Sequence, residues 1–320
     1  MSRRIIHDPN RDGIDRRGFL ECMAWAGAGV LYTMAGGVLR SQTIAPATLN
    51  PGGPRGEFTF VQISDSHIGF KHEPNKDVTA TLQEAVERIN ALPERPDFII
   101  HTGDITDLSE PSQFDTADQI MRSAKAGALF HVPGEHDVLT DDGKGYLERY
   151  GRKTKGGWYS FDHKGVHLIG LVNVLNLKPG GSGLLGDDQL AWLQNDVSGL
   201  SASTPIVLFA HRPLWPIYPE WGWATDDSAQ AIGYLKRFGS VTVLNGHIHQ
   251  VMQKVEGNVT FHTAMSTAFP QPQPGTAPAP GPLKVPAEKL RSLLGLSGVS
   301  CTRGQNSLAI IDSTLAGQTT

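Results

Sequence analysis

Cysteine is nearly absent from this chain, which holds only Cys22 and Cys301 among 320 residues. If Cys22 is removed with an N-terminal leader, no internal disulfide can form. The chain also lacks a large excess of charge of either sign, because its net charge is only −4. It becomes −6 without residues 1–47, which hold six basic and four acidic side chains. A mildly acidic surface argues against tight binding to nucleic acid or to acidic membranes.

The chain also lacks internal repeats and long, strongly apolar runs. Its N-terminal stretch 22–39 approaches the minimum length of a membrane span but is rich in glycine and alanine. The preceding Asp15-Arg16-Arg17-Gly18-Phe19-Leu20 resembles a twin-arginine export motif, and Ala45-Pro46-Ala47 fits a small-residue cleavage site. Two alternatives stay open: a chance arginine pair in a disordered start, and an uncleaved membrane anchor.

We therefore expect three parts along the chain. Residues 1–47 are predicted to be a twin-arginine signal peptide, 48–56 a linker, and 57–320 one domain with a Pro-rich insertion at about 269–286. The leader predicts the twin-arginine export machinery as a partner and a periplasmic or secreted location. No stable membrane insertion is expected after cleavage.

Five short apolar runs each end directly before side chains that can bind a metal ion. The runs are 58–64, 96–102, 128–133, 205–210 and 241–245. They lead into Asp65-Ser66-His67, Gly103-Asp104-Ile105-Thr106-Asp107, Gly134-Glu135-His136-Asp137, Ala210-His211-Arg212-Pro213 and Gly246-His247-Ile248-His249. Continuous apolar runs bounded by Gly or Pro are typical of strands buried on both faces.

Helical spacing of apolar residues separates these runs. The ranges with this spacing are 77–92, 112–125, 187–197 and 227–238. The alternation predicts an α/β fold with a largely parallel sheet. A predicted hairpin at 158–173 indicates a more antiparallel second sheet, and we expect a short helix at 287–296 and an edge strand at 307–311. Because ligands of open α/β sheets bind past the carboxyl ends of the strands, the five polar segments should lie close together.

The side chains of these segments suit a pair of metal ions. Two metals about 3.5–4 Å apart can stabilise both the attacking and the leaving oxygen of a phosphoryl displacement. Mixed oxygen and imidazole ligands favour iron, manganese, zinc or cobalt over magnesium or calcium. Cysteine is absent from all five segments, which argues against a structural zinc site.

In this order, the motifs DSH, GDITD, GEHD, AHRP and GHIH resemble those of the calcineurin-like metallophosphoesterase superfamily. The resemblance covers roughly 57–262 and the strand expected near 306–311. The stretches 64–69, 189–193 and 211–213 are most similar to the bacterial cyclic-nucleotide-phosphodiesterase-like branch. Purple acid phosphatases carry Tyr where Asp107 stands, which disfavours that branch. The resemblance implies a four-layer αββα sandwich with the metal site at the carboxyl ends of the strands.

The resemblance also implies a role for each motif residue. Asp65, His67 and His249 would bind one metal, Asp104 would bridge, and Glu135, His211 and His247 would complete the second site. His136 would contact the phosphate and protonate the leaving alkoxide. Asp137 would orient His136, and Asp107 would orient a histidine ligand. A hydroxide bridging the two metals would be the nucleophile. The metals implied are iron, manganese or both, with zinc as an alternative.

Position 135 departs from the family, which has Asn where this chain has Glu135. A carboxylate is a stronger ligand for a hard cation, adds negative charge and cannot donate a hydrogen bond to phosphate. We therefore expect tighter metal binding and weaker attraction for an anionic substrate. A catalytically inactive metal-binding homologue is an alternative that this residue alone favours, and retention of His136 counts against it.

Four aromatic residues follow His211 closely. They are Trp215, Tyr218, Trp221 and Trp223. One interpretation is a well-packed loop, and the other is an aromatic wall that binds a ring or acyl chain of the substrate. His101 and His131 are expected to be core residues or supports of the site, and His72, His163, His167 and His262 structural or surface residues.

The sequence thus predicts an exported dinuclear-metal phosphoesterase that cleaves diesters, and monoesters as a further activity, in a small-molecule substrate. The alternative within enzymes is a narrow-specificity hydrolase of a phospholipid headgroup or an envelope nucleotide conjugate.

Overall fold

The computed structural model describes residues 30–35, 38–43, 57–151, 156–175, 177, 181–301 and 308–316, with side chains from residue 57 onward. These ranges leave out most of the expected signal peptide, including its cleavage site, and the whole expected linker. Within 1–47 only β1 (Val30–Ala35) and β2 (Val38–Thr43) are described, and they pair antiparallel with each other. In the described ranges, none of the helices combines the length and apolar character that crossing a membrane requires.

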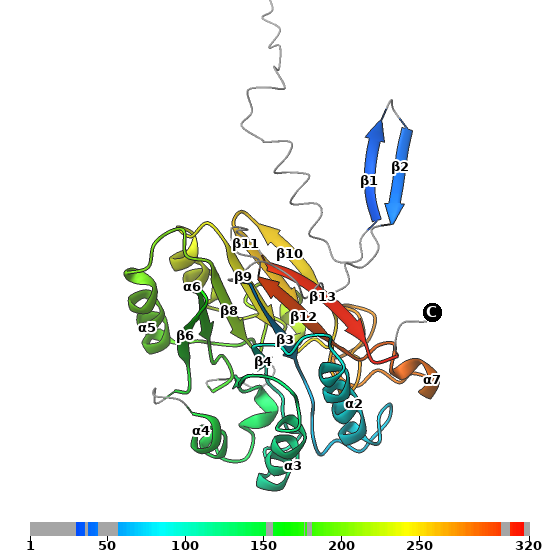
Figure 1. Cartoon of the computed structure of the whole chain (residues 1–320). Helices are drawn as coiled ribbons and strands as arrows, with labels where there is room; N and C mark the ends of the chain where they lie inside the picture. The colour runs from blue at the N-terminus through cyan, green and yellow to red at the C-terminus, as the bar shows by residue number, and fades with distance from the viewer. Residues whose placement is uncertain are drawn as a thin grey trace, which may run out of the picture.

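One sheet of five strands carries the first three metal-binding motifs. Its order is β13 (Leu308–Thr314), β12 (Gly295–Cys301), β3 (Phe58–Ile63), β4 (Phe98–His101) and β5 (Leu129–His131). The strands β3, β4 and β5 are parallel, whereas β12 runs antiparallel to both neighbours. Helices α2 (Val78–Asn90) and α3 (Pro111–Met121) cover its outer face (Figure 1).

A second sheet of six strands carries the other two motifs. Its order is β10 (Gln253–Glu256), β11 (Val259–Thr263), β9 (Val241–Asn245), β8 (Ile206–Ala210), β7 (Val166–Gly170) and β6 (Tyr159–His163). The central strands are parallel, and the two edge strands β10 and β6 are antiparallel. Helices α5 (Asp187–Ser198) and α6 (Ser228–Leu235) pack on the outer face of this sheet.

Alternation along each strand divides the apolar side chains among three core layers. On β3, Phe58 and Phe60 point between the sheets, whereas Val61 and Ile63 face α2 and α3. On β8, Val207 and Phe209 meet the first sheet, while the alternate residues face α5 and α6. Each strand is apolar on both faces because each sheet is covered on both sides. The result is the four-layer αββα sandwich that the sequence predicts.

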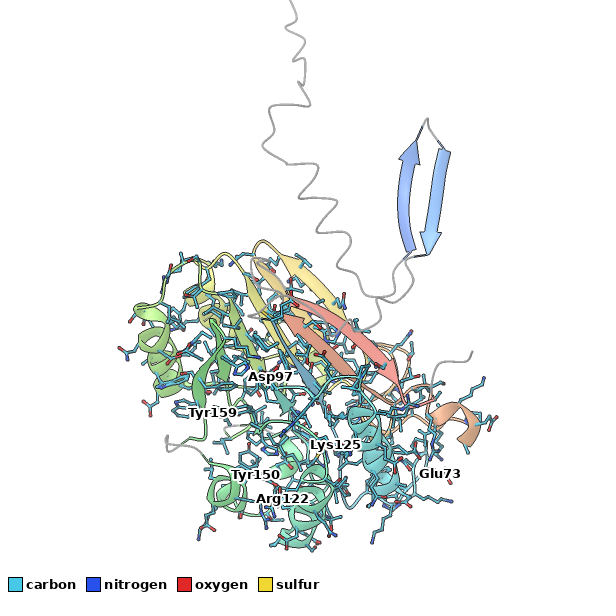
Figure 2. The ribbon with its side chains drawn as sticks, viewed as in Figure 1. Glu73, Asp97, Arg122, Lys125, Tyr150 and Tyr159 are labelled. Carbon is cyan, nitrogen blue, oxygen red and sulfur yellow. The ribbon has the colours of Figure 1, made fainter. Side chains whose placement is uncertain are left out.

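Several contacts fix the two sheets to each other. Lys164, in the β6–β7 turn, donates to the Asp97 carboxylate just before β4 at 2.7 Å, and His163 pairs with the same carboxylate at 3.0 Å. The Tyr159 hydroxyl on β6 donates to the backbone carbonyl oxygen of His131 on β5 at 2.8 Å. Asp97 and Tyr159 are labelled in Figure 2. These polar links help to set how the strand ends of the two sheets face each other.

Most of the elements expected from the sequence are confirmed, with three differences. The expected hairpin forms, but as the edge of a sheet whose centre is parallel, so the expectation of a more antiparallel second sheet was wrong. The helix expected at 287–296 is shortened to α7 (Ala287–Leu290), because 295 onward pairs in β12. The strands β10, β11 and β12 were not expected. Short elements α4 (Lys144–Tyr150), η1 (Glu135–Asp137) and η2 (Pro219–Trp221) complete the described part.

Candidate metal centre

The five motif loops converge where the carboxyl ends of the two sheets meet. Strands β3, β4 and β5 deliver Asp65, His67, Asp104 and Glu135, and strands β8 and β9 deliver His211, His247 and His249. Every one of these side chains except that of Glu135, which is 17% exposed, is less than a tenth exposed. Burial of so many polar groups at one place requires partners that satisfy them.

Three groups of potential ligand atoms form at this junction, two of them from the predicted ligands and a third from His67, Asp104 and His136. The first contains Asp65, His67 and His249, and the second contains Asp104, Glu135, His211 and His247. Within each group the ligand atoms lie within 4.8 Å of one another. Asp104 also reaches the first group, since its Oδ2 atom lies 3.6 Å from Nε2 of His67 and 3.2 Å from Nε2 of His211. Asp104 therefore occupies the position of a bridging ligand between two metal sites.

The backbone is strained where it presents these side chains. Left-handed φ angles between 41° and 71° occur at five ligand residues. They are Asp65, His67, Asp104, His247 and His249. Such conformations cost of the order of 1 kcal/mol or more in non-glycine residues and cluster at functional sites. The surrounding fold therefore stabilises a backbone that the local sequence does not favour.

The motif glycines allow the loops to approach closely. A Cβ atom on Gly134 would lie 2.1 Å from Oδ1 of Asp104. Gly103 has a φ of +98°, and a Cβ atom there would lie 2.6 Å from Nδ1 of His211. A larger residue at either position would displace a potential ligand, which explains why these motifs contain Gly.

The donor set fits metal ions better than it fits a hydrogen-bonded network. In the described part of the chain, the buried atoms His67 Nδ1, His211 Nε2 and His247 Nε2 lack a hydrogen-bond partner. The Nε2 atoms of His67 and His249 face each other at 3.3 Å. Carbonyl oxygens of Thr102 and Phe269 accept from Nδ1 of His211 and His249 at 2.8 and 2.5 Å. These contacts leave Nε2 of both rings as the ligating atom.

Mutual charge shifts the titration of the buried groups. Burial raises the pKa of Asp65 and of Glu135, but nearby His249 and His247, respectively, contribute to lowering both pKa values below the usual carboxyl range. Burial lowers the pKa of His211, yet Asp104 and Glu135 raise this pKa well above its ordinary value. Opposite charges packed this closely are a signature of a functional site.

His136 lies beside both groups but is held differently from the ligands. Its Nδ1 atom donates to the backbone carbonyl oxygen of Asp107 at 2.7 Å. Burial lowers the pKa of His136, but the charges of Asp104 and Glu135 outweigh this and raise the pKa to about 9. Oδ1 of Asp107 lies 3.6 Å from Nδ1 of His67, which places it beside a candidate histidine ligand. The ring of His136 is 37% exposed, so it can reach a substrate.

The expectation that Asp137 orients the ring of His136 was wrong. The Asp137 carboxylate accepts from the backbone N–H groups of Ile105, Thr106 and Gly134, and from the Thr106 hydroxyl. The η1 turn directs this side chain toward the loop after β4 rather than toward the adjacent ring. Burial and the charge of Asp104 raise the pKa of Asp137 to about 6 despite these donors. Asp137 thus fixes the two loops that carry Asp104 and His136.

Two of the four aromatic candidates are core residues. Trp215 is 7% exposed and packs on Phe261, and Trp223 is fully buried. They cannot form the expected wall over the metals, because packing of the loop after β8 directs them inward. Tyr218 and Trp221 are partly exposed and contact each other edge to face with centroids 5.1 Å apart. Any aromatic contact with substrate from this loop therefore falls to Tyr218 and Trp221.

Sequence reasoning missed Arg212 and Phe269. Arg212 directs its guanidinium at Glu135, and its place next to a ligand histidine was the available signal. Phe269, at the start of the Pro-rich segment, lies with its ring centroid 4.7 Å from those of His67 and His249. His101 is buried and bonded to Ser66 Oγ at 2.8 Å, and burial lowers its pKa to about 3, so it is a neutral support as expected.

Comparison with known proteins places this geometry in a family. The model of the calcineurin-like phosphoesterase family matches residues 58–251. A glycerophosphodiester phosphodiesterase GpdQ of Enterobacter lignolyticus is 26% identical over 228 residues, covering 67% of this chain and 78% of that protein. A probable cyclic nucleotide phosphodiesterase of Rhodococcus erythropolis is 25% identical over 231 residues, covering 68% and 73%.

Solved structures show the same fold. A dimetal phosphatase from Danio rerio superposes with a TM-score of 0.58 at 14% identity, over 81% of this chain and 98% of that one. A purple acid phosphatase from yellow lupin superposes with a TM-score of 0.57 at 12% identity, over 81% and 52%. The chain therefore belongs to the calcineurin-like phosphoesterase family and is a metal-dependent phosphoric ester hydrolase.

Proposed function

We propose that this chain is an exported phosphodiesterase with two metal ions, which hydrolyses small phosphodiesters and acts on phosphomonoesters as a further activity. The observation that carries the proposal is the pair of ligand groups that share Asp104. The relatives named as glycerophosphodiester and cyclic nucleotide phosphodiesterases support a small diester as substrate. Iron, manganese or both fit the mixed carboxylate and imidazole donors, with zinc as an alternative.

The proposed roles follow from the contacts. Asp65, His67 and His249 would hold one metal, Glu135, His211 and His247 would hold the other, and Asp104 would contribute to both sites. When bound, the metals lower the pKa of water and act as Lewis acids toward the phosphoryl group. Phe269 and Thr102 orient the rings of His249 and His211 through their carbonyl oxygens. Fixed ligands of this kind preorganise the site before substrate arrives.

His136 is the proposed general acid. Its Nδ1 proton is held by the Asp107 carbonyl oxygen, so the proton for the leaving alkoxide comes from Nε2. A protonated ring is also a cation beside an anionic phosphate.

The first test combines metal analysis with substrate comparison on the full chain. We expect about two metals per chain by elemental analysis, and faster hydrolysis of bis-p-nitrophenyl phosphate than of p-nitrophenyl phosphate with added manganese, iron or zinc. One metal or none at saturation would overturn the dinuclear assignment. Two metals without turnover of either compound would contradict a general diesterase and leave a narrow-specificity hydrolase or an inactive homologue.

Export by the twin-arginine route is part of the proposal. It rests on the Arg16-Arg17 motif and on the advantage of loading metals before a folded protein is exported. We expect the wild-type chain in the periplasmic or secreted fraction of a bacterium that has this pathway. The Arg16→Lys, Arg17→Lys double variant should stay in the cytoplasm, and normal export of that variant would refute the route.

A second candidate substrate class is favoured by two exposed leucines. Leu108 follows Asp107 directly and is 48% exposed, and Leu139 lies three residues after His136 and is 56% exposed. Their loops are joined by a 2.8 Å hydrogen bond between the hydroxyls of Ser109 and Thr140. Exposed apolar side chains on the loops of a metal site suit a substrate with an acyl chain, such as a lysophospholipid with its headgroup diester.

This second candidate is tested with matched substrates. A lysophospholipid and its deacylated glycerophosphodiester carry the same headgroup and differ in the acyl chain. Replacing Leu108 and Leu139 with Ser should raise KM for the lysophospholipid and leave KM for the deacylated diester unchanged. An equal effect on both substrates would remove the acyl chain from the argument.

A further inference from the structure

The Arg212 guanidinium forms a two-point contact with the Glu135 carboxylate. Nη2 of Arg212 donates to Oε1 at 3.1 Å, and Nε donates to Oε2 at 3.4 Å. The two side chains are only 11% and 17% exposed. Paired donors of this kind fix the plane of a carboxylate as well as its charge. The pair lies at the second ligand group, since Glu135 also contacts His211 and His247 at 2.9 Å each.

Other contacts hold Arg212 in place from the opposite side. Its Nη1 atom donates to the carbonyl oxygens of Gly181 at 2.6 Å and Gly222 at 3.2 Å. Its backbone N–H meets Asn173 Oδ1, and its carbonyl oxygen accepts from Asn173 and Asn245. Four of the five guanidinium N–H groups are therefore engaged. Arg212 is consequently a fixed group, with little capacity left for direct contact with a substrate.

The charges around the candidate metal site indicate what a fixed guanidinium group does there. Asp65 and Asp104 bring two buried carboxylates to the two metal positions and Glu135 a partly buried one, and the proposed substrate is itself an anion. Each uncompensated carboxylate would repel a phosphate, and a partly buried charge acts at short range with little screening. Arg212 carries a permanent positive charge at the most exposed of these three carboxylates.

We propose that Arg212 is a positioning residue that fixes Glu135 and cancels its charge, so that the metal centre retains its affinity for an anionic phosphoryl group. On this proposal, the expected weakening of attraction for an anionic substrate by Glu135 would be offset by Arg212. The inference rests on the proposed two-metal function. It makes the Glu135–Arg212 pair, rather than Glu135 alone, the unit that sets phosphate affinity at the second metal position.

The test compares Arg212→Gln with Arg212→Lys in the full chain. Inorganic phosphate is the probe, and its Kd is measured by calorimetry at saturating manganese, with bound metal checked by elemental analysis. Arg212→Gln should weaken phosphate binding by about tenfold or more, because one charge is lost close to the metals. Arg212→Lys should recover most of that affinity, since it keeps the charge although it loses the planar fork. Metal content should remain that of the wild type in both.

A matched control is Arg237→Gln. The Arg237 guanidinium also donates to carbonyl oxygens, those of Val197 and Leu200, but at α5 rather than at the metal loops. Phosphate Kd should not change in this variant. Equal weakening by Arg212→Gln and Arg212→Lys, with metal retained, would show that the fork geometry matters and the charge does not, and would overturn the proposal.

A double variant that combines Arg212→Gln with Glu135→Gln provides an independent test. This double variant has the net charge of the wild-type pair, so phosphate affinity should return toward the wild-type value. Affinity as weak as in Arg212→Gln alone, at equal metal content, would contradict charge cancellation. If the wild-type chain itself bound fewer than two metals or no phosphate, the proposed function would fail instead, so the two failures are distinguishable.

Discussion

Nδ1 of His136 donates a hydrogen bond to the backbone carbonyl oxygen of Asp107 at 2.7 Å. A carbonyl oxygen can only accept, so Nδ1 carries a proton in every state that keeps this bond. The remaining nitrogen, Nε2, is then the one that exchanges protons with a ligand. Oδ1 of Asp107 also lies 3.9 Å from Nδ1, so the same residue places a carboxylate beside the ring.

We predict that His136→Ala lowers kcat on an alkyl phosphodiester by about 10²–10⁴-fold, the usual contribution of general acid catalysis. The metal content should be unchanged, because the ring is not one of the seven proposed ligands. Steady-state kinetics and elemental analysis of the same preparation measure both. His72→Ala, at an exposed histidine of the loop before α2, is the control and should behave as wild type.

The leaving group provides a second check on His136. An alkoxide needs a proton to depart, whereas p-nitrophenolate is stable without one. The loss of rate in His136→Ala should therefore be much smaller for a p-nitrophenyl diester than for an alkyl diester. An equal loss on both substrates would mean that the ring binds phosphate and does not donate a proton.

We predict that Asp104→Ala loses both metals. Its carboxylate reaches histidine ligands of both groups, at 3.6 Å for His67 and 3.2 Å for His211, so neither site is complete without it. We expect about two metals per chain in the wild type and far less in the variant, as measured by elemental analysis after dialysis. Asp188→Ala, at an exposed position of the first turn of α5, is the control. Full occupancy of one site in Asp104→Ala would show that Asp104 does not bridge.

The sequence predicted the central fold well because buried strands have a strong local signature. The runs that became β3, β4, β8 and β9 are continuous and apolar, and the helices between them have clear spacing. Every residue of β10 is exposed and most are polar, so this segment forms a strand only because it pairs with β11. β12 contains Gly295, Gly298 and two serines, and it becomes a strand only because it completes the sheet beside β3.

The clustering of the candidate ligand residues was also predictable, because each motif follows a strand that ends at the same edge. What the sequence could not give is the direction of a side chain in a short turn. Asp137 and His136 are neighbours in η1, yet one faces backbone N–H groups and the other the open site. Arg212 was missed for a related reason: its partner Glu135 is 77 residues away and meets it only in the folded chain.

We predict different effects for replacement of two tryptophans in the loop after β8, one on stability and the other on KM. Trp223 is fully buried, so Trp223→Ala should lower the free energy of unfolding by about 3–5 kcal/mol. Trp221 is partly exposed, so Trp221→Ala should leave stability nearly unchanged and raise KM for a substrate with a ring or acyl chain. Urea denaturation and steady-state kinetics separate the two. An unchanged KM on every substrate tested would remove Trp221 from the site.

The last prediction concerns His167 on β7, which is well separated in sequence from the candidate metal ligands. Burial lowers the pKa of His167, but its contacts with Asp196 at 2.9 Å and Asp162 at 2.8 Å raise it above the ordinary 6.5. A raised pKa in the folded chain means that protonation stabilises the fold. This stabilisation is complete below pH 6.5 and is lost as the pH rises through the folded-state pKa.

His167→Gln should therefore reduce the free energy of unfolding by more at pH 6 than at pH 9. Urea denaturation of both proteins across this range measures the difference, and other titrating groups cancel because they are common to both. His72→Gln is the control at an exposed histidine and should change the free energy of unfolding little. A difference that stays constant from pH 6 to pH 9 would mean that His167 remains neutral, and that its two aspartate contacts are ordinary hydrogen bonds.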